Sequence, residues 1–281
     1  MGNKPFRASM LFALTFFAFN FLYSQTFDLQ YIPKDEKQFG LSYYRTFYKN
    51  SPYISTSTSV YQLYLDVPVG SKLNLIGDIP YISTSYSANY GFSEGSYYAN
   101  GLGNIFIGLQ SNLSSGENSK NIITFGLYLP TASEDASYNG MVSDFYYMSK
   151  YIPNSIGIYF NYAFHKRNME GLDYGLEIGP NIISPTKRNN ATTEFFAHYG
   201  IITGYRIDQF SLNLEFVGNV IISGEIQEFS DRFINMLNIG AQWMGPTVTP
   251  RIFYKIYLRD TIRQTVDGVL GVGVNLSINW K

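Results

Sequence analysis

The chain contains no cysteine, which excludes disulfide bridges and processing as a lipoprotein. Charged residues are also scarce: Asp, Glu, Lys and Arg make up 15% of the 281 residues, against about 25% in ordinary soluble domains. A soluble domain with so few charges would lack polar cover for its surface. Histidine occurs only twice, so we expect no transition-metal site and no cofactor.

Long apolar runs are missing beyond the first residues, so we expect no membrane-spanning helix in the rest of the chain. The start carries Lys4 and Arg7, an apolar run over Met10–Leu22, and then Ser24 before Gln25. This order predicts a secretory signal peptide over residues 1–24; an uncleaved anchor is the alternative, although the run is shorter than the ~20 residues of a spanning helix. Residues 25–37 are predicted to form a periplasmic lead or a small plug, and the barrel domain to cover 38–281.

Loss of the two basic residues of the signal peptide leaves 18 Lys and Arg against 21 Asp and Glu, a net charge of −3. We therefore expect no nucleic-acid partner.

Aromatic residues are abundant, with 25 Tyr and 22 Phe, and apolar residues alternate with polar or small ones along most of the chain. Segments of about ten residues with this period are typical of transmembrane β-strands. The expected strands lie at residues 39–48, 61–67, 73–81, 104–110, 122–129, 155–164, 172–179, 194–206, 210–216, 234–243, 248–259 and 266–280. This alternation predicts an all-β fold, a transmembrane antiparallel barrel of about twelve strands in the outer membrane of a Gram-negative bacterium, and twelve is an even number, as such barrels usually require. A soluble β-sandwich is the alternative fold.

Short connections alternate with long ones, as in barrels with short periplasmic turns and long outer loops. Long loops are expected at 84–102, 131–154, 181–193 and 224–233, which places both termini in the periplasm. In the last strand, from Val266 to Trp280, the odd-numbered residues are predicted to face inward. Its end, Gly273–Trp280, resembles the signal that the outer-membrane assembly machinery reads, except that Lys281 follows the aromatic residue.

Three segments carry a family resemblance: Leu73–Tyr81, Asn100–Leu109 and Phe125–Thr131. They resemble the outer-membrane barrel family named for the MetA pathway of phenol degradation, whose members are described as transporters. The motif positions here are Gly101, Gly103, Asn104 and Pro130; Asn104 stands where the family usually has an acid, and Ala132 where it has glycine. The resemblance implies passage of small, apolar or aromatic molecules. A purely structural role for the glycines, in turning and in leaving space inside the barrel, is the alternative.

The candidates for catalysis are the two histidines and the acid pair Glu134-Asp135. His165 is expected in a turn and the acid pair in a solvated loop. His198 is expected on the inward face, but Gly200 stands where an outer-membrane phospholipase has its serine, so the nucleophile is absent. We therefore predict that the protein is not an enzyme.

Charged residues predicted on inward faces are the candidates for the control of solute passage. Arg251, Lys255 and Arg259 are four residues apart on one strand and would form a basic ladder. The acidic candidates are Asp173, Glu177, Glu215, Asp78 and Asp66. These charges would either select solutes or pair with one another and fill the barrel.

Together these patterns favour a passive channel for small solutes, in contact with the lipid bilayer and outer-membrane lipids. The second hypothesis is a non-conducting structural or adhesive barrel whose outer loops bind partners.

Overall fold

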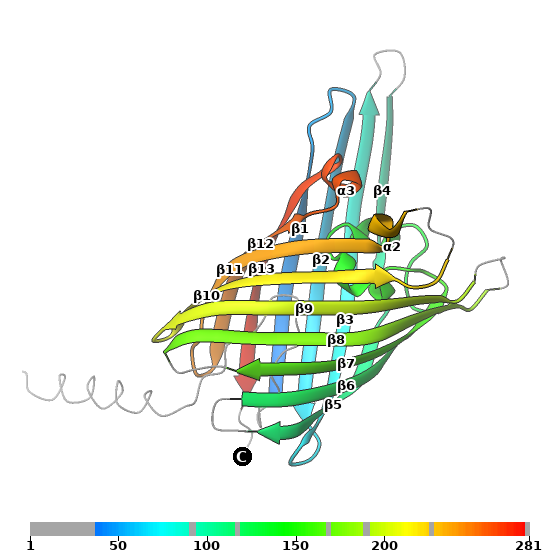
Figure 1. The fold of residues 1–281 in the computed structure, drawn as a ribbon. Helices are drawn as coiled ribbons and strands as arrows, with labels where there is room; N and C mark the ends of the chain where they lie inside the picture. The colour runs from blue at the N-terminus through cyan, green and yellow to red at the C-terminus, as the bar shows by residue number, and fades with distance from the viewer. Residues whose placement is uncertain are drawn as a thin grey trace, which may run out of the picture.

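The computed structural model describes residues 37–89, 94–115, 119–166, 170–187, 192–224 and 228–278, and most of them belong to one antiparallel sheet (Figure 1). The strands are β1 (Lys37–Tyr48), β2 (Ile54–Pro68), β3 (Leu73–Asn89), β4 (Glu94–Leu102), β5 (Phe106–Ser115), β6 (Ser119–Tyr128), β7 (Ser155–Lys166), β8 (Gly171–Pro185), β9 (Glu194–Ile207), β10 (Phe210–Ile221), β11 (Phe233–Trp243), β12 (Val248–Tyr257) and β13 (Val266–Ile278). The predicted signal peptide, residues 25–36 of the predicted lead or plug, and Trp280 lie outside the described residues, and Lys37, the last residue of that predicted segment, begins β1.

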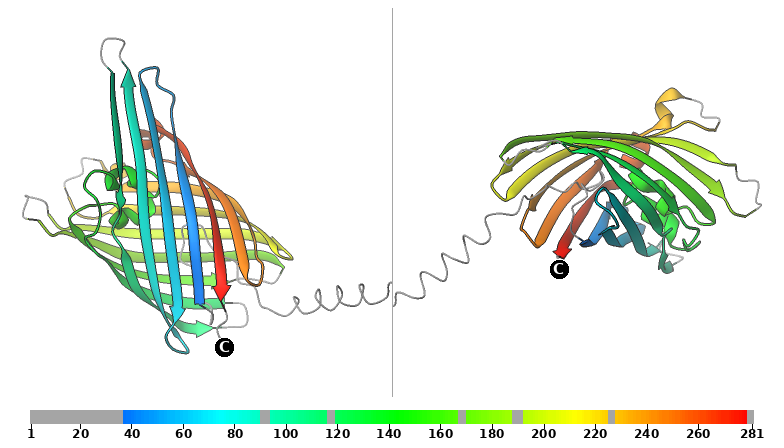
Figure 2. Two further views of the ribbon diagram at one scale, coloured as in Figure 1. Left: turned by 180° about the vertical axis from the view of Figure 1, so that it is seen from behind. Right: turned by 90° about the horizontal axis from the view of Figure 1, so that it is seen from below.

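The sheet closes on itself. Apart from β4 and β5, each strand pairs with its neighbours in sequence, and β1 pairs with β13 from Lys37 opposite Ile278 to Tyr48 opposite Val266 (Figure 2). Strands β4 and β5 both pair with β3, one above the other, so they are two halves of one wall strand. The thirteen elements therefore build a closed barrel of twelve strands, and the predicted fold class is confirmed.

The two faces of the wall differ as the alternation predicts. On β10, Leu212 and Leu214 are 53% and 40% exposed, whereas Asn213 and Glu215 between them are 3% and 0% exposed. Other strands repeat this pattern, with Leu, Ile and Phe outward and mostly polar side chains inward. A closed wall with an apolar outer face is the form in which strands can satisfy their backbone in lipid.

A row of tyrosines marks where the apolar band ends on one side of the barrel. Tyr43, Tyr61 and Tyr81 are paired across β1, β2 and β3, with ring centroids 5.2 and 6.4 Å apart. Beyond this row the outward positions of β3 change from Leu and Ile to Ser83 and Ser85. Tyrosines are enriched at the membrane–water interface, so we place the interface at this row.

The predicted loop at 84–102 is wrong: β3 and β4 form a tall hairpin that continues the wall beyond the tyrosine row (Figure 1). Its serine-rich strands are solvated on both faces near the tip and lack the apolar alternation by which the other strands were found. The start of the last strand also differs from its prediction. Val266 is buried and Asp267 is exposed, because a bulge in β13 reverses the faces there: Phe47 of β1 lies opposite Gly268 and Tyr48 opposite Val266, which leaves Asp267 as the extra residue.

The helical elements of the described residues are short. They are α2 (Ser137–Met141), η1 (Phe145–Lys150), η2 (Phe229–Arg232) and α3 (Asp260–Arg263). Within the described ranges, none of these helices has the length and apolar character needed to cross a membrane.

Candidate functional site

The segment between β6 and β7, residues 129–154, folds back into the barrel. The sequence predicted an outer loop at 131–154, but Tyr146, Met148 and Lys150 of η1 are only 1–5% exposed. We call residues 131–154 the lumen loop. Its aromatic sequence explains the inward course, because Phe145, Tyr146 and Tyr147 gain a buried environment there.

Hydrogen bonds join the lumen loop to strands around the wall. Thr46 of β1 bonds with Ser143 at 2.7 Å, Tyr257 of β12 donates to the carbonyl of Val142 at 2.7 Å, and Asn219 of β10 donates to the carbonyl of Phe145 at 2.8 Å. Ser149 of the loop donates to Asn181 of β8 at 3.0 Å, and the hydroxyl of Tyr146 donates to Glu177 of the same strand. The loop is therefore held across the lumen and not along one side of it.

Two buried lysines provide ion pairs between the loop and the wall. Lys150 Nζ lies 2.7 Å from Asp78 Oδ2 on β3, and Lys255 Nζ of β12 lies 3.2 Å from Asp144 Oδ1. Lys150 also lies 3.8 Å from Asp144, so the four charges form a chain from β3 through the loop to β12. All four side chains are less than 9% exposed. Such pairs add little stability over apolar contacts, but loss of one partner leaves a buried charge and is costly.

The motif residue Asn104 anchors the other side of the lumen loop. This residue is fully buried between β4 and β5, and its Nδ2 donates to the carbonyls of Ser149 and Ile152, both at 2.8 Å. Its Oδ1 accepts from the N–H of Ala132 at 2.9 Å, and its own N–H donates to the carbonyl of Lys150 at 2.6 Å. An amide side chain donates and accepts at once, which a carboxylate at this position cannot do.

The two motif glycines give the loop room against the wall. A Cβ on Gly103 would lie 2.5 Å from the carbonyl oxygen of Lys150, and one on Gly101 would lie 2.4 Å from Cβ of Ser133. Thr131 caps the same place, because its hydroxyl donates to the carbonyl of Gly103 and accepts from the N–H of Ile105. Pro130 is exposed and lies two residues after the end of β6 at Tyr128. The motif residues Gly101, Gly103 and Asn104 thus form the surface of the wall on which the lumen loop packs.

Substitution of Gly103 should weaken the packing of the lumen loop against the wall. In Gly103→Ala the new methyl group overlaps backbone on the loop side and the ring of Pro80 on the wall side, so we expect a loss of about 1–3 kcal/mol, the range for overpacked sites. The midpoint of unfolding in urea would measure it. Gly95→Ala is the matched control, because no atom lies within 4 Å of its Cβ position; equal midpoints for both variants would contradict the close approach.

An aromatic cluster lies where the lumen loop meets the wall. The ring of His198 stacks on Tyr159 with centroids 4.7 Å apart, and Tyr146 meets His198 edge-on. Asn161 links His198, through a 2.9 Å bond to Nε2, to Glu177, whose other oxygen accepts from Tyr146. Phe106, Tyr128 and Tyr147 complete the cluster.

The remaining predicted charges occupy separate places. Asp66, Asp173 and Glu215 face inward and are buried, and Asp66 accepts a 2.6 Å bond from Asn74. Arg251 also faces inward and donates to Ser42 at 2.8 Å. Arg259 does not continue the basic ladder, because β12 ends at Tyr257; its side chain lies at the rim, 3.4 Å from Asp231.

The lumen at the level of the loop is filled by side chains. Inward residues on neighbouring strands there, such as Val217 of β10, Met236 of β11 and Lys255 of β12, are all 0% exposed. At the loop end of the barrel, a hollow of about 650 Å³ lies over the lumen loop and is lined by Glu134, Tyr138, Ile152, Ile183 and Glu194, among others.

At the rim of this hollow, the exposed carboxylate of Glu134 accepts hydrogen bonds from Lys187 and Asn154. Hydrogen bonds from Lys187 and then Asn154 hold the pKa of Glu134 below its ordinary value.

Sequence reasoning missed the loop partners, Asp144 and Lys150, because it placed both in water. The signal was present: each stands within a run of aromatic residues too apolar for a solvated loop. In the part of the chain that the structure describes, no group of three or more His, Asp or Glu side chains is arranged to hold a metal ion.

No protein-family model matches the chain, and no curated protein matches it in sequence. Among solved structures, an outer-membrane channel from Pseudomonas putida F1 is similar over 91% of this chain and 100% of its own, with 13% identity and a TM-score of 0.61. Looser likenesses are the translocator domain of the autotransporter NalP from Neisseria meningitidis (11% identity, 97% and 95% covered, TM-score 0.49) and the monoaromatic hydrocarbon channel CymD (7% identity, 88% and 90% covered, TM-score 0.46). With the closed wall and its apolar outer face, the first likeness shows the fold: the chain is a twelve-stranded β-barrel integral to the outer membrane.

Proposed function

We propose that the protein is a gated channel for small solutes, and that the lumen loop is its constriction. The observation that carries this proposal is that the loop crosses the lumen and is held there by hydrogen bonds and ion pairs. The loop is not itself a strand of the wall. The hydrogen bonds exchange with water at a modest net cost, and when the loop leaves the lumen both partners of each ion pair regain contact with water, so the loop can be displaced while the wall stays intact.

The lining favours small aromatic or apolar solutes that carry a polar group. Phe106, Tyr128, Tyr147 and Tyr159 present ring faces and edges, and Glu177 and Asn161, which bond to each other, place polar groups beside them. The resemblance to the family named for the MetA pathway supports the same solute class. Both termini lie in the periplasm in this proposal, which makes the hollow over the loop the outer mouth.

Planar-bilayer recording of the refolded protein tests the function. We expect brief current steps of low conductance separated by long closed periods, because the resting lumen is filled. Migration on a gel before and after heating controls for folding: a folded barrel changes its mobility. A heat-dependent shift with no current under any voltage or added aromatic solute would contradict the channel.

In that case the filled lumen and the tall hairpin would favour the second candidate, a non-conducting barrel whose outer surface binds partners.

A further inference from the structure

The upper half of the divided wall strand, β4, is paired on one side only. It pairs with β3 from Tyr81 opposite Leu102 to Asn89 opposite Glu94. The other side of β4 has no neighbouring strand within the described ranges, because β6 already ends at Tyr128 (Figure 1).

Two hydrogen bonds show which backbone groups point to the open side. The N–H of Gly103 donates to the carbonyl of Pro80 on β3, whereas the carbonyl of Leu102 accepts from Ser133 in the lumen loop, away from β3. Backbone direction alternates along a strand. The N–H and C=O groups of Glu94, Ser96, Tyr98 and Asn100 therefore point to the open side as well. Within the described residues, no backbone hydrogen bond to these groups from that side is present.

This edge lies in water and lacks the usual protection. It stands beyond Tyr81 of the tyrosine row, and Tyr98 is 77% exposed. Natural edge strands are commonly shielded by lysine, proline or a bulge along the edge. Between residues 94 and 102 there is no lysine and no proline.

We infer that the open edge of β4 binds an extended, lysine- or arginine-bearing segment of another protein, which adds one strand to the hairpin. An extended polypeptide presents alternating N–H and C=O groups at the spacing of the edge, which makes it the matching ligand. This interaction is independent of solute passage.

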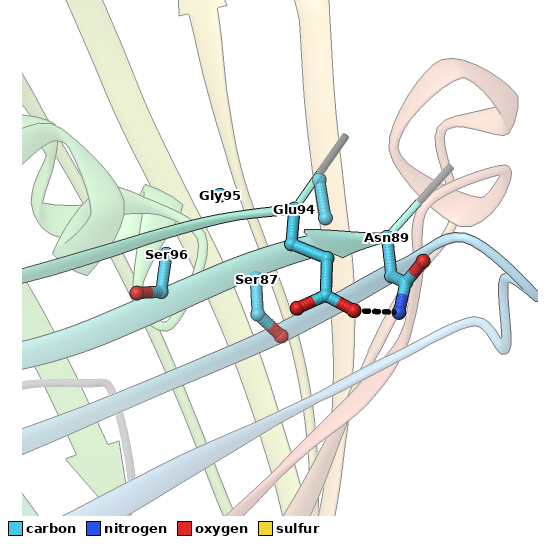
Figure 3. A pocket seen from close by; sticks show the side chains of 6 residues that line it. Ser87, Asn89, Glu94, Gly95 and Ser96 are labelled. Carbon is cyan, nitrogen blue, oxygen red and sulfur yellow. Dashed lines mark hydrogen bonds between the residues drawn. The ribbon is translucent and has the colours of Figure 1, made fainter. Parts of the chain in front are cut away.

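The surface beside the edge indicates the charge of the partner. A shallow hollow of about 310 Å³ lies at the hairpin tip, with Ser87, Asn89, Glu94 and Ser96 around it (Figure 3). Its small serine side chains leave room, and the carboxylate of Glu94, which accepts from Asn89 at 2.8 Å, supplies negative charge. A lysine or arginine of the added strand fits this position.

The test uses the refolded full-length protein in lipid nanodiscs and two synthetic eight-residue peptides. One alternates Thr and Val with two lysines, and the other has glutamate in place of lysine. Hydrogen exchange of single amides is measured by NMR with and without peptide. We expect the lysine peptide to slow exchange at least tenfold at Glu94, Ser96, Tyr98 and Asn100, and to leave Gly95, Tyr97 and Ala99, already bonded to β3, unchanged.

Ser96→Pro and Ser96→Ala form the matched pair. Proline removes an N–H that faces away from β3, so the hairpin is retained, and it should abolish binding of the lysine peptide; alanine removes only the hydroxyl and should preserve it. Gel mobility before and after heating verifies that both variants fold.

Equal binding by both variants, or no slowing at the four amides, overturns the inference. Slowing without peptide that rises with protein concentration would assign the edge to a second copy instead, and binding of the glutamate peptide as tightly as the lysine peptide would overturn the charge assignment.

Discussion

Asn104→Ala should open the barrel. The variant loses three side-chain hydrogen bonds to the lumen loop. At about 1 kcal/mol each they amount to about 3 kcal/mol, which raises the population of displaced loop roughly a hundredfold. We expect open time in bilayer recordings to rise by that order, and trypsin to cleave after Lys150, which is inaccessible when its side chain is 3% exposed.

The matched control is Asn121→Ala. Asn121 bonds Ser114 and Tyr162 near the opposite end of the wall and makes no contact with the lumen loop among its hydrogen bonds. Its variant should conduct and resist trypsin like the original protein. If Asn104→Ala also remains closed and uncut at Lys150, the loop is not a gate seated by the motif.

Lys255→Met should be the most destabilising single change in the lumen. It leaves Asp144, 2% exposed, with Lys150 at 3.8 Å as its remaining lysine partner. Removal of one member of a buried pair typically costs about 3–5 kcal/mol. We expect a clear fall in the midpoint of unfolding in urea.

Two further variants show whether charge is the cause. The double change Lys255→Met with Asp144→Asn should recover at least half of the loss, because Lys150 keeps Asp78 at 2.7 Å. Lys49→Met removes a lysine from an exposed pair with Asp267 and should have almost no effect, as surface pairs contribute about 0–1 kcal/mol. A double variant no more stable than Lys255→Met would attribute the loss to packing instead.

The wall could be predicted from sequence because lipid enforces alternation. On a strand such as β10, one face meets lipid and the other meets the lumen, so the polarity of each residue indicates the face on which it lies. All twelve wall strands were predicted for this reason. The hairpin tip was missed because both of its faces meet water, so Ser and Tyr follow one another without a period.

The site was predictable only in part, because it joins the wall to a segment without periodicity. Alternation placed Asp78, Glu177, His198 and Lys255 inward, as found. It carries no information on where a connection between strands goes, so the partners Asp144 and Lys150 were assigned to the outside. The motif around Asn104 was noticed as a resemblance, and its contact with the lumen loop required the structure.

The route of the lumen loop also fixes an order of events in folding. Its partners stand far apart along the chain: Ser143 bonds Thr46, 97 residues earlier, and Asp144 pairs with Lys255, 111 residues later. Those two strands come near each other only once β1 has met β13 at the seam. Contacts between such distant residues form slowly, because a large loop of chain must first be closed. We therefore expect the contacts of Ser143 with β1 and of Asp144 with β12 to form after the wall has closed, so that the newly closed barrel is at its most permeable just before this step.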